Sequence, residues 1–295
     1  MGATGHVGHV IVEELLKRGH VVRAIGRNVD KLHQLEIKGA NLVLCEFDDV
    51  EVLTQSFKDA YAVFCFIPPA SSGGSDFSRY QDRVSEAICQ ACVAAGVDRL
   101  VNLSSMGAGL SEGTGPIVGL HRHEERLNTL NIFTTLIHLR PTLFMENLNE
   151  YISMILNQQV IRSPIDQNLP IEMVATRDIG WKAADFLDST ANFGNLVFEF
   201  VGPKEVTMNQ VAEAFGQILE IPELRYQQIS FDEARKEWLQ AGMTEEIVGL
   251  VLEMYKAFNS HQIWPTQELT LTHHGTTTLQ AYVQHITHKL FAYLH

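Results

Sequence analysis

The chain has 295 residues, of which 45% are hydrophobic and 19% are charged, and its formal net charge at pH 7 is −13. This composition is that of an ordinary globular protein, and the length is enough for one large α/β domain or for a domain plus a small lobe. The acidic balance, without any run of basic residues, argues against direct binding to nucleic acid or to a membrane surface. Because the sequence has neither a signal peptide nor the roughly 18–20 apolar residues of a membrane helix, we expect a cytoplasmic protein.

The first two-thirds of the chain alternates segments of helical periodicity with short apolar runs. Strands are predicted over residues 20–25, 41–47, 61–67, 99–104 and 133–139. Helices are predicted over residues 7–18, 30–38, 50–58 and 119–130, and over a long segment that follows the Ser/Gly-rich loop 71–75 and ends at Ala95. This alternation is typical of βαβ units, and the apolar strands indicate a parallel sheet that is buried on both faces.

The last third of the chain has a more mixed pattern. It contains a predicted strand over residues 195–201 and predicted helices over residues 208–219, 231–241, 245–258 and 278–293. We therefore predict an α/β fold with a doubly wound, mostly parallel sheet of the Rossmann type and a smaller C-terminal substrate lobe. The expected dinucleotide-binding domain is residues 1–145, and the lobe, part of which returns to the sheet, is residues 146–295.

A glycine-rich turn stands at the start of the chain. Glycines recur at every third position, directly before the first predicted helix. One glycine permits a tight turn, another lets the backbone approach a pyrophosphate, and another lets the helix pack close to a strand. The N-terminus of the helix offers free N–H groups and the positive end of its dipole to phosphates. This pattern favours dinucleotide binding over a plain strand–helix connection, through Gly2, Thr4, Gly5, His6, Val7 and Gly8.

Such a turn normally follows a buried strand of about five to seven residues that is central in the sheet. Only Met1 precedes Gly2 here, so we expect the first strand to be missing and interpret the start as late or truncated. On this hypothesis, upstream residues would raise both the melting temperature and the affinity for the cofactor.

The end of the strand predicted over residues 20–25, which would be the second strand of a complete Rossmann fold, bears on the choice of cofactor. A site that prefers NAD usually carries Asp or Glu there to hold the ribose 2′-OH. Arg27, 19 residues after Gly8, stands there instead and suits a 2′-phosphate, so we predict NADP(H) in preference to NAD(H). The alternative is a solvent-exposed arginine after a strand. Glu46 and Phe47, at the end of the strand predicted over residues 41–47, are expected to meet the adenine.

Several segments spread over most of the chain resemble the NmrA-like branch of the atypical short-chain dehydrogenases/reductases. The resembling segments are the glycine turn, Arg27, Leu-Val-Asn-Leu-Ser-Ser-Met-Gly-Ala at 100–108, Leu-Arg-Pro-Thr-Leu-Phe-Met-Glu-Asn at 139–147, Ala-Thr-Arg-Asp-Ile at 175–179, and the Gly-Pro turn at 202–203 before a Thr207-capped helix. The string at 139–147 is fairly specific to this branch, whereas the glycine motif is not.

The resemblance implies an extended Rossmann fold, NADP(H) in the cleft and a small C-terminal lobe. The family includes redox-sensing regulators that bind the dinucleotide without turning it over. It also includes NADPH-dependent quinone reductases and related reductases, so membership alone does not decide whether the chain is an enzyme.

The residues of the usual catalytic machinery are only partly present. Active members of the wider superfamily use Tyr-x-x-x-Lys together with a serine at the end of the preceding strand. Ser104 and Ser105 stand at the serine position, but the next helix has no tyrosine, and no lysine lies between Lys58 and Lys182. NmrA-like proteins commonly keep a lysine on this helix, and His121 takes its place. We expect Ser104 and His121 to contact the cofactor, and Ser105 and His121 to be the catalytic candidates.

His121 is expected to bind the ribose or to act as an acid, and the alternative is a histidine at the start of a helix that faces solvent. His123 is expected to be exposed. We reject a metal site built from His121, His123 and Glu125, because residues i and i+2 do not share a helix face. Cys89 and Cys92 form C-x-x-C, which we interpret as two buried reduced thiols on one helix rather than as a redox pair or half of a zinc site.

Further candidate contacts follow two other strands. Ile67 and Pro68 are expected beside the cofactor, since ligands bind outside the carboxyl ends of strands in such sheets. Pro141, Phe144 and Asn147 follow the last Rossmann strand; Pro141 is assigned to the cofactor, and the other two to the substrate. Core packing is the alternative for Phe144.

Two functions fit these features. The first is an NADPH-dependent oxidoreductase that acts on a small, quinone-like acceptor. The second is a non-catalytic NAD(P) redox sensor that acts through a regulatory protein partner. The missing Tyr-x-x-x-Lys disfavours sugar-nucleotide epimerisation and alcohol–ketone chemistry. It does not exclude every reductase, because the nicotinamide itself supplies the hydride.

Overall fold

The computed structural model describes residues 1–69 and 76–294, and the loop expected at residues 71–75 lies outside them. The chain divides into two compact units. The first consists of residues 1–112, 116–140 and 176–198, and the second of residues 113–115, 141–175 and 199–295. Each unit is built around its own hydrophobic core.

The strands of the first unit alternate with helices along the chain. The strands are β1 (Arg23–Gly26), β2 (Asn41–Leu44), β3 (Val63–Phe66), β4 (Arg99–Leu103), β5 (Thr135–Pro141) and β9 (Gly194–Phe200). Strands β3, β4, β5 and β9 form one sheet in that order, while β1 and β2 form a separate pair. The pairs β1–β2, β3–β4 and β4–β5 are all parallel. The predicted α/β fold with a parallel sheet is thereby confirmed.

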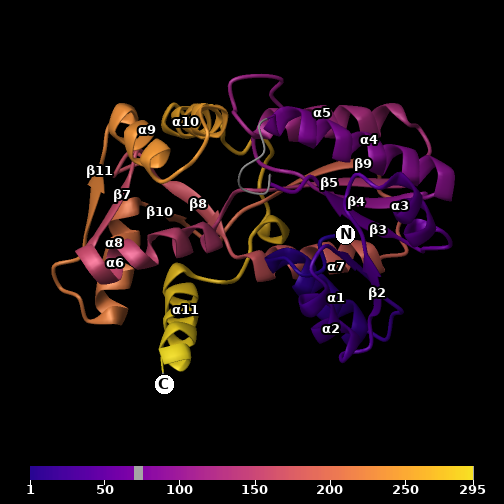
Figure 1. Cartoon of the computed structure of the whole chain (residues 1–295), viewed down its shortest axis with the longest axis horizontal. Coiled ribbons are helices and arrows are strands. Elements are labelled where there is room, and N and C mark those ends of the chain that lie inside the picture. The colour runs from indigo at the N-terminus through magenta and orange to yellow at the C-terminus, as the bar shows by residue number, and fades with distance from the viewer. Residues whose placement is uncertain (70–75, 295) are drawn as a thin grey trace. The chain divides into compact units, whose positions relative to one another are not determined.

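Helices cover both faces of this sheet, as a doubly wound fold requires. The helices of the first unit are α1 (His6–Lys17), α2 (Val29–Glu36), α3 (Val50–Phe57), α4 (Phe77–Ala95), α5 (Ile117–Thr129) and α7 (Thr176–Asp188). Figure 1 shows α4 and α5 on one face of the sheet, and α1 and α7 on the other. Close packing of α1 against α7 depends on Gly180, where a Cβ atom would lie 2.6 Å from Cβ of Val10.

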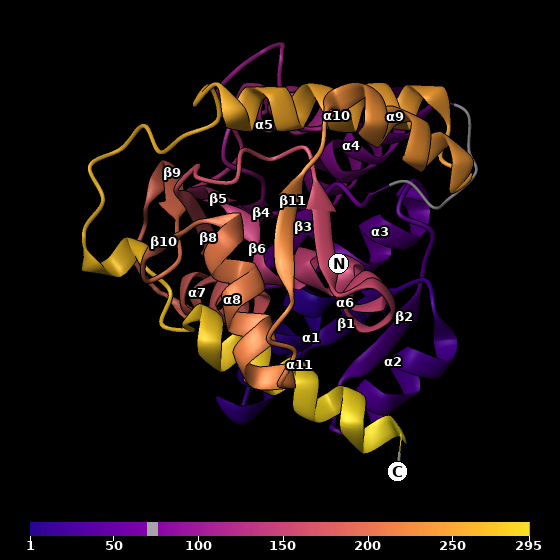
Figure 2. The same ribbon diagram turned by 90° about the vertical axis from the view of Figure 1, so that its left-hand side faces the viewer.

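The second unit contains short strands and four of the predicted helices. Its elements are β6 (Leu143–Phe144), the 3₁₀ helix η1 (Met145–Tyr151), α6 (Ile152–Gln158), β7 (Val160–Ser163), β8 (Ile171–Val174), β10 (Glu205–Val206), α8 (Met208–Leu219), β11 (Arg225–Gln228), α9 (Phe231–Gln240), α10 (Glu245–Asn259), η2 (Leu271–His273) and α11 (Leu279–Leu294). Thr207 and Ser230 form capping boxes at the starts of α8 and α9. Figure 2 shows α8 beside β11 and crossing α11.

The first residues of the chain lie between β1 and β3. The Met1 amino group donates a hydrogen bond to the Phe64 carbonyl (2.7 Å), and the Ala3 N–H donates to the Ile25 carbonyl (3.0 Å). Within the described residues, no strand pairs with the facing edges of β1 and β3. The two sheets are therefore linked at this point by a two-bond contact with the start of the chain.

His123 is fully buried in the first unit, so the prediction that it is exposed was wrong. Its Nδ1 lies 2.8 Å from the Ser85 hydroxyl of α4, and its Nε2 lies 3.9 Å from the Cys65 sulfur of β3. The periodicity of α5 does not reveal that α4 covers this face. Burial, together with the positive charges of nearby His138 and Arg126, lowers the pKa of His123 to about 3.

The cysteines agree with the sequence prediction. Cys89 and Cys92 are buried on α4, and all four cysteines are free thiols. Burial raises the pKa of both thiols, so neither has the thiolate character of a redox centre.

The buried His123 predicts a specific acid sensitivity. The unfolded chain takes up its proton near pH 6.5, whereas the folded chain does so only near pH 3. The free energy of unfolding should therefore fall as the pH decreases from about 6.5 towards 3, by up to about 1.4 kcal/mol per pH unit. Denaturant unfolding at several pH values should show a smaller loss in His123→Gln than in the wild type. His33→Gln, at an exposed histidine, should retain the wild-type loss, and equal slopes in all three proteins would contradict this account.

Candidate functional site

The glycine turn leads directly into the first turn of α1, and its glycines have different roles. Gly2 has φ of +67°, and a Cβ atom there would lie 2.3 Å from the ring of Phe66. A Cβ atom on Gly8 would lie 2.1 Å from the Gly2 carbonyl oxygen, so the backbone of the turn packs directly on the helix. Gly5 is the N-cap residue of α1, and no side chain caps this helix.

The N-terminus of α1 is open to an anion. Gly5 and His6 are exposed, and the first turn carries no acidic residue. The amide groups of a first helical turn have no partner within the helix, and the helix dipole places positive charge there. Val7 is buried, with its backbone oxygen close to Gly180, and Thr4 is half-buried near Gly26. This geometry fits a phosphate group.

Arg27 is exposed directly after β1, and aromatic side chains hold its position. Its guanidinium lies 5.1 Å from the centroid of the Phe47 ring, and its Nη1 lies 3.4 Å from the Tyr80 hydroxyl. Phe47 is buried and meets Phe66 edge to face, with 5.7 Å between the ring centroids. Because Phe66 also fills the space beside Gly2, the arginine and the glycine turn are joined through a continuous aromatic contact.

The other predicted cofactor contacts in this unit follow the ends of its parallel strands. The carboxyl ends of parallel strands share one edge of a sheet, where ligands bind in such folds. Glu46 is exposed after β2, while Ile67 and Pro68 are buried after β3. The structure thus places these residues after the expected strands, and their contact with a cofactor stays a prediction.

Ser104 and Ser105 follow β4 and differ in their surroundings. Ser104 is buried, and its hydroxyl has no hydrogen-bond partner within the described residues, although its N–H donates to the Leu139 carbonyl (2.8 Å). A buried hydroxyl without a partner is costly, and a ligand or a water molecule commonly satisfies such a group. The Ser105 hydroxyl donates to the Met106 carbonyl (3.0 Å).

His121 lies on the first half of α5 and is half-buried. Its Nδ1 is 2.9 Å from the Ala108 carbonyl oxygen, in the loop that follows β4. A carbonyl oxygen only accepts, so Nδ1 carries the proton and, in the neutral ring, Nε2 is left as an acceptor. The backbone therefore fixes both the orientation and the tautomer of His121, which a histidine merely facing solvent would lack.

An ion pair between α5 and β5 is the main feature of this region that the sequence analysis missed. Arg140 Nε donates to Glu124 Oε1 (2.9 Å), and the Glu124 side chain is 3% exposed. Removing one partner of such a buried pair typically costs about 3–5 kcal/mol, so the pair holds α5 firmly against the end of β5. Its only signal in the sequence is an arginine at the end of an apolar strand.

The predicted residues beyond β5 belong to the second unit. Pro141 is buried at the end of β5, Phe144 is half-buried at the end of β6, and Asn147 is exposed in η1. Their roles towards a cofactor or a substrate stay predictions.

Neither a membrane-spanning helix nor a cluster of metal ligands is found among the described residues. Within them, no helix is both long enough and apolar enough to cross a membrane. No group of three or more His, Cys, Asp or Glu side chains gathers there as metal ligands. His121 and His123 in particular have different neighbours, since the first contacts a loop carbonyl and the second a buried serine.

Sequence comparisons with known proteins find two similar oxidoreductases. An NmrA-like family domain-containing oxidoreductase of Penicillium ochrochloron is 28% identical over 243 residues, which are 74% of this chain and 67% of that protein. An NAD(P)H azoreductase of Xenophilus azovorans is 22% identical over 255 residues, 86% of this chain and 85% of that protein.

Among solved structures, an NADPH-dependent quinone oxidoreductase of Escherichia coli in complex with NADPH matches with a TM-score of 0.80. The match covers 97% of this chain and 98% of that one at 21% identity, and it shows the fold alone. The model of the NmrA-like family matches residues 1–283. Since this match spans nearly the whole sequence, the chain belongs to the NmrA-like family.

Proposed function

We propose that this chain binds NADP(H) at the glycine turn and reduces a small, conjugated, quinone-like acceptor. The observation that carries the proposal is the pairing of two anion sites on adjacent elements. The uncapped N-terminus of α1 suits a pyrophosphate, and Arg27 at the end of β1 suits a 2′-phosphate. The NAD(P)H azoreductase and the NADPH-dependent quinone oxidoreductase support the acceptor class, because azo and quinone groups both accept two electrons.

The residues of the proposed site have separate roles. The first-turn amides of α1 bind the pyrophosphate, and Arg27 binds the 2′-phosphate. Glu46 and the backbone of Phe47 meet the adenine, because the Phe47 side chain itself is buried. The partnerless Ser104 hydroxyl donates to the bound dinucleotide. The remaining proposed contacts are Ile67, Pro68 and Pro141 for the cofactor and Phe144 and Asn147 for the acceptor.

Hydride transfer from the nicotinamide requires little from the protein beyond holding the dinucleotide and the acceptor in position. When bound, the reduced nicotinamide supplies a hydride, and the acceptor also takes up a proton, which solvent can provide. We assign His121 Nε2 as the acceptor of a hydrogen bond from the ribose, because Nδ1 already donates to the Ala108 carbonyl. Ser105 is the second proposed catalytic residue, and we place it beside the nicotinamide and the acceptor.

A non-catalytic sensor is the second candidate function. The observation that favours it is that His121 stands on a helix that has neither the tyrosine nor the lysine of the wider superfamily. Such a protein would bind the dinucleotide through the same glycine turn. It would interact with a regulatory protein partner according to the redox state of the dinucleotide.

Arg27→Ala should separate the two dinucleotides. Loss of a charge-assisted contact with the 2′-phosphate should weaken NADPH binding by about 10- to 100-fold and change NADH binding by less than about threefold. Calorimetric titration with both dinucleotides measures the two effects. Lys17→Ala, at the opposite end of α1, should leave both affinities unchanged. Equal losses for NADPH and NADH would refute the assignment of Arg27.

His121→Phe should weaken NADPH binding by about fivefold, because the proposed ribose contact and its Nδ1 anchor are both lost. His121→Gln, which keeps polar atoms at the end of the side chain, should recover part of that affinity. Melting temperatures of both variants distinguish loss of binding from loss of the fold. If His121→Phe binds NADPH as the wild type does, His121 has no role at the cofactor.

Turnover decides between the two functions. Purified protein is incubated with NADPH and a panel of quinones and azo compounds, and the loss of NADPH absorbance is followed. We expect saturable oxidation of NADPH with at least one conjugated acceptor. Tight NADPH binding without turnover across the whole panel would reject the reductase and support the sensor, whereas failure to bind NADPH would reject both.

A further inference from the structure

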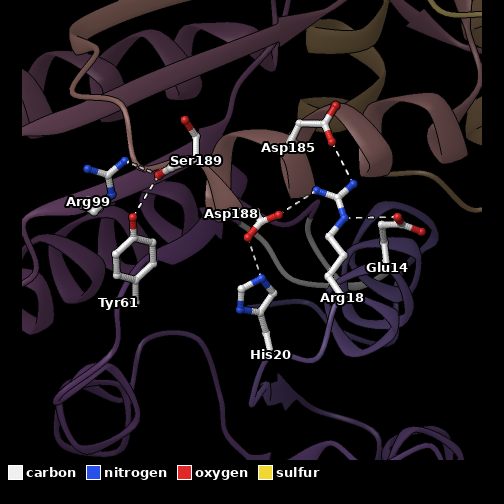
Figure 3. A network of polar contacts seen from close by, with 8 residues as sticks. All are labelled: Glu14, Arg18, His20, Tyr61, Arg99, Asp185, Asp188 and Ser189. Atoms are coloured by element: carbon white, nitrogen blue, oxygen red, sulfur yellow. Dashed lines mark hydrogen bonds and ion pairs between the residues drawn. The ribbon is translucent and has the colours of Figure 1, made fainter.

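Arginines on the surface of the first unit differ in how their charge is neutralised. Arg18 of α1 pairs with Glu14 (3.2 Å), Asp185 (2.7 Å) and Asp188 (3.3 Å), as Figure 3 shows. The charge of this guanidinium is thus more than balanced by protein groups. Arg27, in contrast, pairs with no carboxylate in the part of the chain that the structure describes. Its charge is therefore available to a phosphate.

Tyr80 of α4 stands beside Arg27. A guanidinium only donates hydrogen bonds, so at 3.4 Å the Tyr80 hydroxyl oxygen accepts from Arg27 Nη1. Among the described residues, no group accepts the proton of this hydroxyl. Burial raises the pKa of Tyr80, so the hydroxyl keeps its proton at neutral pH. Arg27 and Tyr80 therefore present an N–H donor and an O–H donor side by side.

Two acidic side chains follow β2 close to this pair of donors. Glu46 and Asp48 flank Phe47, whose ring lies 5.1 Å from the Arg27 guanidinium. Both acids raise the pKa of Tyr80, so their charges act at the same hydroxyl. A phosphate monoester carries a charge of about −1.5 to −2 at pH 7. A free carboxylate beside it would repel it and weaken its binding.

Arg83, one turn after Tyr80 on α4, pairs with one of these acids. Its Nε lies 3.5 Å from Asp48 Oδ2, and its guanidinium lies 5.8 Å from the centroid of the Tyr80 ring. Both side chains of this ion pair are exposed, so the pair adds little to the free energy of unfolding. It nevertheless neutralises Asp48 next to the two donors.

We propose that Tyr80 and Arg83 determine the preference of the site for NADP(H) over NAD(H). Tyr80 is a binding residue, whose hydroxyl donates to the 2′-phosphate that Arg27 holds. Arg83 is a positioning residue, which pairs with Asp48 and so keeps this carboxylate from repelling the phosphate or pairing with Arg27. The inference rests on the proposed binding of NADP(H). Both residues come from α4, so the sequence at the end of β1 does not reveal them.

Tyr80→Phe keeps the ring and removes the donor. It should weaken NADPH binding by about three- to tenfold and change NADH binding by less than about twofold, measured by calorimetric titration of the full chain. Tyr61→Phe is the matched control, because the Tyr61 hydroxyl already donates to the Ser189 carbonyl (2.9 Å), as Figure 3 shows. This control should keep the wild-type ratio of the two affinities. The same ratio in Tyr80→Phe would overturn the role of Tyr80.

Arg83→Gln should also weaken NADPH binding by about three- to tenfold, with little change for NADH, because Asp48 loses its neutralising partner. The melting temperature should not change measurably, since the ion pair is exposed. Asp48→Asn, added to Arg83→Gln, should restore the affinity for NADPH. Arg83→Lys, which keeps the charge, should bind NADPH nearly as the wild type does. A double variant that binds NADPH no better than Arg83→Gln alone would overturn the role of Arg83.

Failure of this inference and failure of the proposed function give different results. If the wild type binds NADPH no more tightly than NADH, the assignment of NADP(H) falls, and the inference falls with it. If the wild type prefers NADPH and Arg27→Ala loses this preference, but Tyr80→Phe and Arg83→Gln keep it, only the inference is overturned.

Discussion

The close approach of backbone to backbone in the glycine turn is the constraint on which the candidate site depends. Gly8 lies so near the Gly2 carbonyl that a Cβ atom there would overlap it. Gly2 in turn leaves room for the ring of Phe66, which packs against Phe47 beneath Arg27. The position of the exposed arginine and the direction of the open helix end therefore follow from the same tight packing.

Polar contacts fix the orientation of His121 and the position of the helix that carries it. The Ala108 carbonyl sets the tautomer of His121, and the buried pair of Glu124 with Arg140 fixes the helix that carries this histidine. These contacts fix an imidazole acceptor on the helix where the sequence analysis expects the lysine of the wider superfamily. A hydrogen-bond acceptor of this kind, which has no permanent charge, is compatible with binding the ribose hydroxyl. The hydride of the proposed reductase reaction then comes from the dinucleotide itself.

The sequence by itself determined the features that depend on local order along the chain. Helical and strand periodicity predicted the parallel α/β fold, and the glycine spacing predicted the turn before α1. The Thr207 and Ser230 caps could likewise be read from neighbouring residues. The position of Arg27 could also be predicted from local sequence, because it depends only on where the preceding strand ends.

The tertiary structure decided everything that requires a distant partner. His123 is buried because α4 covers it, and Glu124 finds Arg140 only once α5 lies over β5. The short strands of the second unit gain their hydrogen bonds from segments far along the chain, so two to four residues carry too weak a pattern to predict them. Periodicity reports which face of an element is apolar, but packing alone determines what meets that face.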